Sequence, residues 1–437
     1  MRRFPAVALA ASLAVTLVAC SPGAGKKEEA TGKTTVTFRL WDENAAKAYE
    51  ESFEAFTSHN PDIQVKVEVV GWNQYWEQLP LDIQSGEMAD IFWTNSSSYA
   101  KFADNGNLID IGQALGSDHD EWVPSTAELY ERNGKLWGVP QIWDSIALFY
   151  NRDLVEKAGV DPASLTWMPE GGDGDTLLPA ARALTFDDAG RHPGDNGFNP
   201  DSRTQFGFNA QADLQAIYLD WLAEAGATFQ GEDDQFAFAS PQGEQAFQYL
   251  VDMANTHHVA PAPAETNQDG DLSRKLFVQG KLALFQSGPY SLPEISENAE
   301  FNWAIAPMVA GPEGRVSVVH AVAAVGNSAS KNVEATTKVL KWLASADGQA
   351  ALASSGAAFP AVVDAQDDYV KFWKDKGVDV TAFQEAAKGA TTKAPVGAAI
   401  DAGLGAIGDP IKEIFLGTTP VPDGLKKAQE SGNTAMK

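Results

Sequence analysis

The segment TTVTFRLWDENAAKAYEESFEAFTSHNPDIQVKVEVV, residues 34–70, changes its hydrophobic period twice. Apolar and polar residues alternate over residues 35–40 and again over residues 63–69, which predicts two strands. Between them, residues 45–56 carry apolar side chains at helical spacing, and Asn60-Pro61 ends that helix. A strand, a helix and a strand in direct succession predict a βαβ unit and therefore an α/β protein.

The same alternation continues along the chain. Short apolar runs at residues 91–93, 108–111 and 136–140 predict further strands of a mostly parallel sheet. The second half repeats the pattern and is also α/β, with helices expected at 214–225, 243–257 and 331–344 and strands at 301–308 and 316–325.

The composition excludes several classes of protein. With 437 residues, 44% hydrophobic and 21% charged, the chain is of ordinary globular type and long enough for two or three domains. Its net charge of −27 would repel a nucleic-acid backbone, so no nucleic-acid partner is expected. A single cysteine, Cys20, excludes intramolecular disulfides and thiolate metal clusters.

The first residues have the composition of an export signal. Arg2 and Arg3 precede an apolar run over residues 4–18 that is too short to span a bilayer. Leu17-Val18-Ala19-Cys20 resembles the cleavage box of bacterial lipoproteins, in which the cysteine becomes the lipid-modified N-terminus. We therefore predict a signal peptide at 1–19, a lipid anchor on Cys20, a flexible tether at 20–33, and a location at the outer face of the cell membrane.

Signatures of catalysis are missing from the sequence. Gly32-Lys33-Thr34 lacks the first glycine of a phosphate-binding loop, because Lys27 stands at that position. Neither Gly-x-Ser-x-Gly nor His-Glu-x-x-His occurs. No catalytic residue, metal or cofactor is therefore expected. An exported glycoside hydrolase nevertheless stays open as an alternative, because its chemistry needs only two suitably spaced carboxylates among 59 Asp and Glu.

Aromatic and polar side chains follow the ends of the predicted strands. These are Trp41-Asp42-Glu43-Asn44, Gly71-Trp72-Asn73 and Trp93-Thr94-Asn95-Ser96-Ser97. Ligands of α/β sheets bind at such strand ends. A tryptophan ring packs on the C–H face of a sugar, and Asn, Asp and Ser bond its hydroxyls. The alternative for any one tryptophan is a place in the core.

Longer motifs point to a family. The most specific is Asn133-Gly134-Lys135-Leu136-Trp137-Gly138-Val139-Pro140, followed by the run 148–154. Phe277-x-x-Gly280-Lys281-Leu282-Ala283 and Ser287-Gly288-Pro289-Tyr290 come later in the chain. Together they resemble the extracellular solute-binding proteins of ATP-binding cassette (ABC) importers, in the maltose-binding-protein-like group that carries sugars. Ala89 departs from the proline usual there.

The resemblance implies a two-lobe periplasmic-binding-protein fold with solute in the cleft between the lobes. It places the N-terminal lobe at 34–145 plus 307–357 and the C-terminal lobe at 146–306 plus 358–437, with crossings near Asp144, Ala306 and Ala358. It further implies a monomer that closes on its solute by a hinge and then docks on the membrane permease of the importer. No bond is broken, so the protein is not expected to be an enzyme.

The resemblance also implies ligand-binding positions. By alignment with sugar-binding members these are Asp42, Glu43, Asn44, Trp93, Asn95, Ser96, Ser97, Asp144, Gln211, Asp213 and Tyr290. Aromatic placement and the lobe edges add Trp72, Trp143, Trp221, His320 and Phe359. Several tryptophans favour a di- or oligosaccharide as the solute. The competing interpretation is the same fold with a charged cleft that binds a non-sugar solute, namely a polyamine, phosphodiester or cation.

Overall fold

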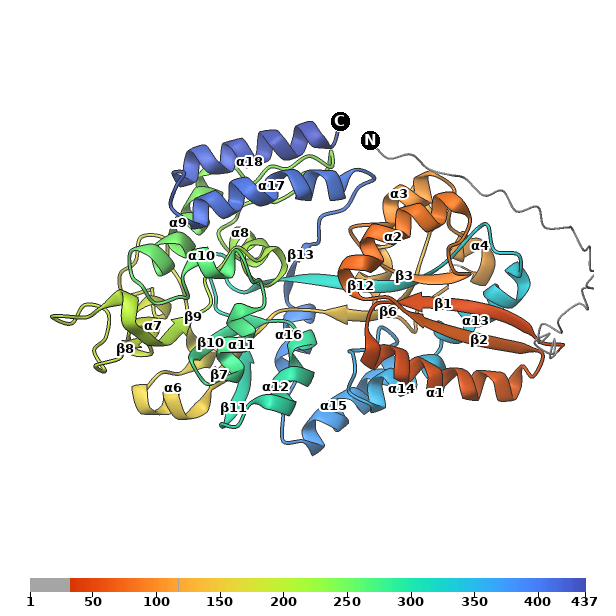
Figure 1. Ribbon diagram of the computed structural model, residues 1–437, viewed down its shortest axis with the longest axis horizontal. Helices are drawn as coiled ribbons and strands as arrows, with labels where there is room; N and C mark the ends of the chain where they lie inside the picture. The colour runs from red at the N-terminus through yellow and green to blue at the C-terminus, as the bar shows by residue number, and fades with distance from the viewer. Residues whose placement is uncertain (1–31, 117) are drawn as a thin grey trace, which may run out of the picture.

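The computed structural model describes residues 32–116 and 118–437 and has two lobes (Figure 1). The predicted signal peptide, Cys20 and all of the predicted tether except its last two residues lie outside the described residues. The predicted βαβ unit is confirmed by β1 (Thr34–Leu40), α1 (Glu43–His59) and β2 (Ile63–Val69). β1 and β2 are parallel over their full length, from the pair Thr34 and Ile63 to the pair Leu40 and Val69.

The sheet of the first lobe has the strand order β13-β12-β3-β1-β2, and β6 pairs with β12. β1 is parallel to β2 and β3, whereas β12 runs antiparallel to β3 and β6. The further strands are β3 (Ile91–Asn95), β6 (Val139–Asp144), β12 (Val316–Gly326) and β13 (Ala390–Lys393). A separate hairpin joins β4 (Glu131–Arg132) and β5 (Lys135–Leu136).

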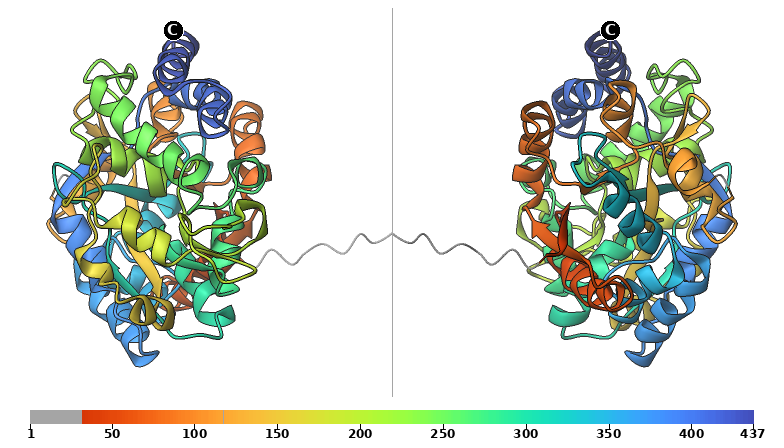
Figure 2. Two further views of the ribbon diagram at one scale, coloured as in Figure 1. Left: turned by 90° about the vertical axis from the view of Figure 1, so that its left-hand side faces the viewer. Right: turned by 90° about the vertical axis from the view of Figure 1, so that its right-hand side faces the viewer.

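Helices cover this sheet on both faces (Figures 1 and 2). They are α1, α2 (Trp72–Ser85), α3 (Tyr99–Asp104), α4 (Ile111–Leu115), α5 (Pro124–Glu128), α13 (Val333–Leu343), α14 (Ala346–Ser354), η5 (Val363–Ala365) and α15 (Gln366–Asp375). α15 packs against α14, and its Tyr369 and Trp373 belong to the hydrophobic cluster of the first lobe. This packing favours assigning α15 to the first lobe. The residue ranges of the lobes stay a prediction.

The sheet of the second lobe has the order β11-β7-β10-β9-β8. Its strands are β7 (Ala147–Asn151), β8 (Phe186–Asp187), β9 (Arg203–Phe208), β10 (Leu282–Ser287) and β11 (Trp303–Pro307). Here β9 and β10 are parallel and the other neighbours are antiparallel. The sheets are thus mixed instead of mostly parallel. β7 follows β6 directly from the other sheet, so its direction is set by the passage between lobes and not by a βαβ crossover.

Helices surround the second sheet as well, and α17 and α18 lie side by side along the upper edge of the molecule (Figures 1 and 2). The helices are α6 (Arg152–Ala158), η1 (Pro162–Ser164), α7 (Leu177–Ala183), η2 (Pro200–Ser202), η3 (Leu214–Tyr218), α8 (Leu219–Glu224), α9 (Pro241–Asn255), α10 (Pro263–Thr266), α11 (Leu272–Val278), η4 (Pro289–Ser291), α12 (Leu292–Asn298), α16 (Thr381–Lys388), α17 (Ile400–Phe415) and α18 (Val421–Ala435).

Two clusters of buried hydrophobic residues form the cores of the protein. One is built on Phe38, Trp93 and Leu340 and continues to Phe149 at the second sheet, and the other surrounds Trp221 in the second lobe. Together with the two sheets, they confirm the predicted two-lobe α/β architecture. In the part of the chain that the structure describes, no helix is both long and apolar enough to cross a membrane.

Candidate functional site

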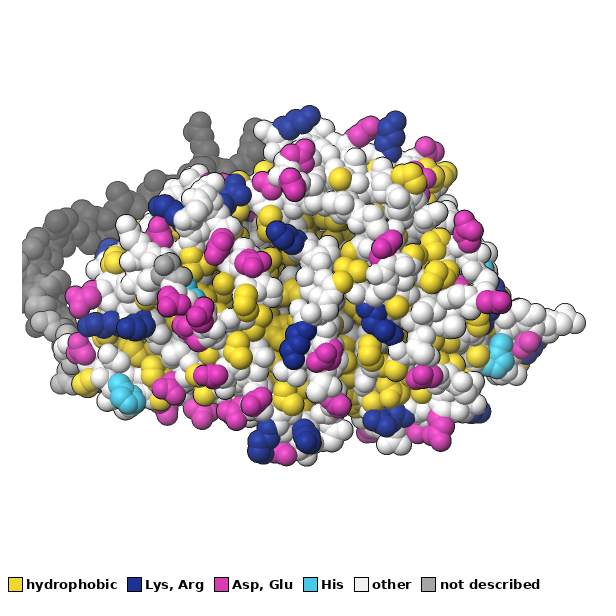
Figure 3. Space-filling view, turned by 180° about the vertical axis from the view of Figure 1, so that it is seen from behind, with side chains coloured by type: hydrophobic (Ala, Val, Ile, Leu, Met, Phe, Trp, Pro, Cys, Tyr) yellow, Lys and Arg dark blue, Asp and Glu magenta, His cyan; other side chains and the backbone are white. Residues whose placement is uncertain are grey.

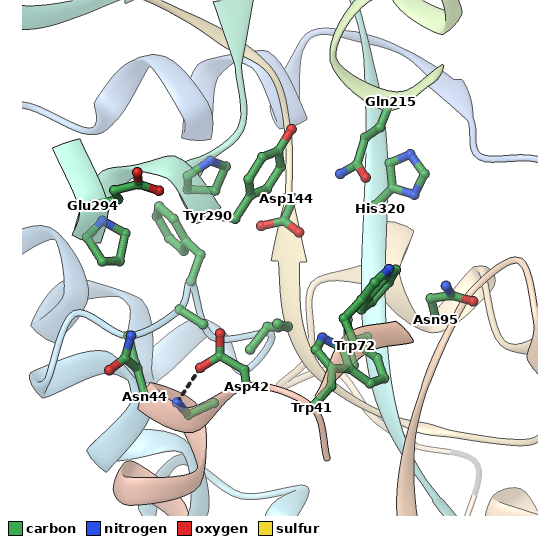
Figure 4. A pocket seen from close by; sticks show the side chains of 18 of the residues that line it. Trp41, Asp42, Asn44, Trp72, Asn95, Asp144, Gln215, Tyr290, Glu294 and His320 are labelled. Atoms are coloured by element: carbon green, nitrogen blue, oxygen red, sulfur yellow. Dashed lines mark hydrogen bonds between the residues drawn. The ribbon is translucent and has the colours of Figure 1, made fainter. Parts of the chain in front are cut away.

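A cleft of about 730 Å³ lies between the two lobes. Its walls come from the carboxyl ends of β1, β3 and β6, from β12, and from the second-lobe segments that begin η3 and contain η4 and α12 (Figure 4). Strand ends and helix starts leave backbone and side-chain polar groups facing a shared space, which is where α/β folds bind ligands. On the face seen from behind, both signs of charge are interspersed around hydrophobic side chains (Figure 3).

Tryptophans form one wall of the cleft. Trp72 is 52% exposed, and its ring meets that of Trp41 edge-on at 5.3 Å between centroids. Trp41 in turn rests on Trp93 at 5.0 Å, and Trp93 is completely buried. The exposed ring is therefore supported from below by two others, which fixes its orientation. A rigid, exposed aromatic face beside polar groups is suited to the apolar face of a sugar ring.

Two aspartates of the cleft are held by helix starts. Asp42 accepts a hydrogen bond of 2.7 Å from the backbone N of Ala45 and so caps α1 (Figure 4). Asp213 accepts one of 2.8 Å from the backbone N of Ala216 at the start of η3. Burial raises the pKa of Asp213. Each carboxylate uses one oxygen in its cap, and the other can accept from a ligand hydroxyl.

Asp144 and His320 form the floor of the cleft, from neighbouring strands. They are direct partners in the antiparallel β6–β12 ladder, so their side chains leave the sheet on the same side. Burial, and secondarily the charge of Asp42, raise the pKa of Asp144 to about 7. Burial lowers the pKa of His320 to about 4. The Nε2 of His320 has no hydrogen-bond partner among the described residues.

The second lobe supplies the opposite wall. Tyr290 follows Gly288, where a Cβ would stand only 2.2 Å from the tyrosine ring, so only glycine lets the ring lie over the backbone there. Glu294 continues the same helical face, and its Oε2 lies 2.6 Å from Nε of Arg274. Arg274 also reaches Asp271, at 2.9 Å. Arg274 thus links α11 to α12 beside the cleft.

The polar groups of the cleft include carboxamides from both lobes. Asn95 accepts hydrogen bonds at its Oδ1 from the Ser97 hydroxyl and the Ser98 backbone, both at 2.9 Å. Gln215 faces the cleft from the second lobe (Figure 4). No group of three His, Cys, Asp or Glu within 32–116 and 118–437 is placed to hold a metal ion. The arrangement offers hydrogen-bond donors and acceptors around an aromatic face.

Most of the predicted ligand-binding residues come together in this cleft. Its lining includes Asp42, Asn44, Trp72, Trp93, Asn95, Ser97, Asp144, Asp213, Tyr290, His320 and Phe359. Their placement depends on the meeting of strand ends that are far apart in the sequence. Their roles in binding stay a prediction.

The lining does not include the predicted Glu43, Ser96, Trp143, Gln211 and Trp221. Glu43 is exposed in the first turn of α1, and Ser96 is completely buried. Gln211 is buried, where its carboxamide accepts a hydrogen bond from Ser273.

Trp143 and Trp221 are core residues. Trp143 precedes Asp144 on β6, and because side chains alternate along a strand it points away from the cleft. Its Nε1 donates to the carbonyl of Pro360 at 3.1 Å. Trp221 stacks on Trp167 at 4.6 Å inside the second lobe.

The cleft also contains residues that the sequence did not single out. Among them are Gln215, Arg274, Glu294 and Glu297. Trp41 also lines the cleft; it directly follows β1 and precedes Asp42, so the strand-end pattern contained it although it was not among the predicted ligand-binding residues. Tyr290, Glu294 and Glu297 are spaced by four and three residues, the period of one helical face, which would have identified the two glutamates.

The sequence of the chain is similar to that of known binding proteins. Residues 41–350 match the family model described as bacterial extracellular solute-binding protein. A maltooligosaccharide ABC transporter solute-binding lipoprotein of Streptococcus pneumoniae is 23% identical over 365 residues, which cover 80% of this chain and 78% of that protein.

Solved structures share the fold. The crystal structure of M. tuberculosis UspC is 44% identical and superposes with a TM-score of 0.78 over 92% of this chain and 100% of that one. The ABC substrate-binding protein Lmo0181 from Listeria monocytogenes, solved in complex with cycloalternan, is 20% identical. Its TM-score is 0.77, and the match covers 92% of this chain and 99% of that one.

Proposed function

The chain belongs to the family of bacterial extracellular solute-binding proteins, and we propose that its solute is a di- or oligosaccharide bound in the cleft between the lobes. The observation that carries this proposal is the exposed ring of Trp72, held on Trp41 beside Asp42, Asn95 and Asp144. A sugar presents C–H faces to such a ring and hydroxyls to such carboxylates and amides.

Asp144 suits a neutral, hydroxyl-bearing solute. With its pKa at about 7, the carboxyl is present in both protonation states near neutral pH and can donate to or accept from a hydroxyl. Specificity follows from the buried polar groups of the cleft. A wrong solute leaves such a group unpaired, at a cost of about 1–3 kcal/mol each.

The binding protein acts without breaking a bond. Solute that contacts both walls favours the closed arrangement of the lobes, because contacts to both are made only there. The closed form then delivers the sugar to the permease of an ABC importer. The S. pneumoniae relative is by name a solute-binding lipoprotein of such a transporter. That name supports export and anchoring through a lipid on Cys20 at the outer face of the membrane.

A cationic solute is the second candidate, favoured by the charge of the cleft. Among the described lining residues, Asp42, Asp144, Asp213, Glu294 and Glu297 carry carboxyl groups, and Arg274 is the only guanidinium or ammonium group. A polyamine would be attracted by this excess. Against it, Arg274 already neutralises Glu294, and burial raises the pKa of Asp144 and Asp213 and so favours their uncharged forms.

Calorimetric titration distinguishes the candidates. The probes are the maltose to maltopentaose series, the mannobiose to mannopentaose series, putrescine and spermidine. We expect at least one sugar to bind at micromolar concentration or below and the amines to give no heat of binding. If an amine binds and no sugar gives a heat of binding, the solute is cationic and not a sugar. Product analysis of the same sugars after long incubation tests for hydrolysis, and release of shorter products would contradict a pure binding role.

A further inference from the structure

A second, smaller cavity of about 240 Å³ adjoins the cleft. It lies between α1, α12 and α15, and its lining shares Asn44, Pro293, Glu297 and Ala357 with the cleft. The two cavities are therefore direct neighbours, and a ligand in the cleft lies close to the smaller one. We call this cavity the α15 pocket.

The apolar side of the α15 pocket is formed by Phe372 and Trp373 of α15. Phe372 packs against Gly356. A Cβ at this position would come within 2.1 Å of the ring, so a larger residue there would displace Phe372. Trp373 is 2% exposed, and its Nε1 donates to no acceptor in the described part of the chain. Because this nitrogen is itself buried, Trp373 contributes ring surface to the lining and no accessible donor.

The polar side of the α15 pocket is electrically balanced. Lys47 and Glu51 come from α1, Glu297 comes from α12, and Lys376 follows α15. The Nζ of Lys376 stands 4.9 Å from the centre of the Phe372 ring. With two ammonium and two carboxylate groups, the pocket has no net charge to select an anion or a cation. It offers both donors and acceptors, which is what several hydroxyls on one ring require.

We propose that the α15 pocket is an additional subsite that binds a further sugar ring of the carbohydrate held in the main cleft. This proposal rests on the proposed function of the cleft and adds to it the part of the protein that sets chain-length preference. A short sugar fills the cleft beside Trp72 alone. A longer one also reaches Asn44 and Glu297 and places its next ring between Lys47 and Lys376.

Two variants and a control test the subsite. Ser296→Trp, on α12, fills the α15 pocket from a position that lines this pocket and not the cleft. Lys376→Ala removes a donor from the pocket without adding volume. Lys374→Ala is the matched control, because Lys374 is exposed at the end of α15 and lines neither cavity.

Affinities for the maltose to maltopentaose and mannobiose to mannopentaose series are measured by calorimetry on each variant. In the unmodified protein, we expect the chain that reaches the pocket to bind at least tenfold more tightly than the next shorter one. Ser296→Trp should abolish this gain, Lys376→Ala should reduce it severalfold, and both should leave the shortest binding sugar unchanged. Lys374→Ala should leave every affinity unchanged.

The other outcomes overturn the subsite. If sugars bind with no gain at any length, or if Ser296→Trp weakens short and long sugars equally or weakens neither, the α15 pocket is not a sugar subsite although the cleft still binds sugar. If no sugar of either series binds any form of the protein, the function proposed for the cleft fails and the subsite fails with it.

Discussion

Asp144 on β6 and His320 on β12 are direct partners in an antiparallel ladder, and the pKa values of the two side chains are shifted in opposite directions. Asp144 has a pKa of about 7 and His320 a pKa of about 4, with burial as the largest cause in both. Between these values both side chains are uncharged in the folded protein. The floor of the cleft therefore carries little charge at mildly acidic pH, although it is built from an acid and a base.

Replacing Asp144 by asparagine should stabilise the unliganded protein in a pH-dependent way. Below about pH 4 both the folded and the unfolded state hold the proton, so the residue contributes nothing. As the pH rises from about 4 to 7, the unfolded state alone loses it, and the free energy of unfolding of the native protein falls. Asp144→Asn removes this loss.

Denaturant unfolding at several pH values checks this expectation. The difference in the free energy of unfolding between Asp144→Asn and the native protein should be near zero at pH 4 and grow to about 2–4 kcal/mol at pH 8. A difference that is constant across this range would show that Asp144 ionises normally in the folded state.

The histidine should show the opposite dependence. Its pKa is lowered, so between about pH 4 and 6.5 the unfolded state holds a proton that the folded state lacks. The native protein then loses stability as the pH falls through this window. His320→Gln should therefore gain stability relative to the native protein at pH 4.5, by about 2 kcal/mol, and lose that gain above pH 7. The same unfolding series measures it, and a gain at pH 8 that equals the gain at pH 4.5 would contradict the assignment.

Trp72 should matter for binding and little for stability. Its ring is 52% exposed, so Trp72→Ala should lower the free energy of unfolding by less than about 1 kcal/mol. The same change removes the exposed face of the aromatic wall, and the affinity for the bound sugar should fall at least tenfold. Leu81→Ala is the matched control, since Leu81 lies on the same helix, is 62% exposed and lines neither cavity. If the two variants bind the sugar with equal affinity, Trp72 does not contribute to the binding site.

The first-lobe side of the cleft was largely predictable from the sequence. Asp42, Asn44 and Trp72 follow strands with a visible alternation, and Asn95 ends a strand that is visible as a short apolar run. The ends of neighbouring parallel strands meet at one edge. The antiparallel pairs were not predictable in this way, because the direction of β7 depends on the passage of the chain between the lobes.

The sequence also did not show which side chains point into the cleft. Alternation along β6 shows that Trp143 and Asp144 point to opposite sides, but the sequence does not show which side meets the cleft. Trp221 has the same ambiguity on a helix that is apolar on most of its surface. Only the packing of Trp221 on Trp167 decides that it belongs to the core.

The lobes also contact each other through Asp401, which bonds Ser98 and Lys101 about three hundred residues earlier in the chain. Its Oδ1 accepts a hydrogen bond of 3.0 Å from the hydroxyl of Ser98, and its Oδ2 pairs with Lys101 of α3. Asp401 stands in the first turn of α17, whose apolar face belongs to the core of the second lobe. A rotation of one lobe against the other about an axis away from this contact stretches or breaks it.

Joining the lobes at this point should therefore slow the exchange of solute. In a chain that begins at residue 32 and so lacks Cys20, Ser98→Cys and Asp401→Cys are combined and linked by a short bifunctional thiol reagent. The rate of sugar association, measured by stopped-flow tryptophan fluorescence, should fall at least tenfold in the linked protein. The unlinked double variant and the reagent-treated Ser98→Cys protein should keep the native rate. If the linked protein binds as fast as these controls, solute enters without relative movement of the lobes, and hinge closure is not the mechanism of capture.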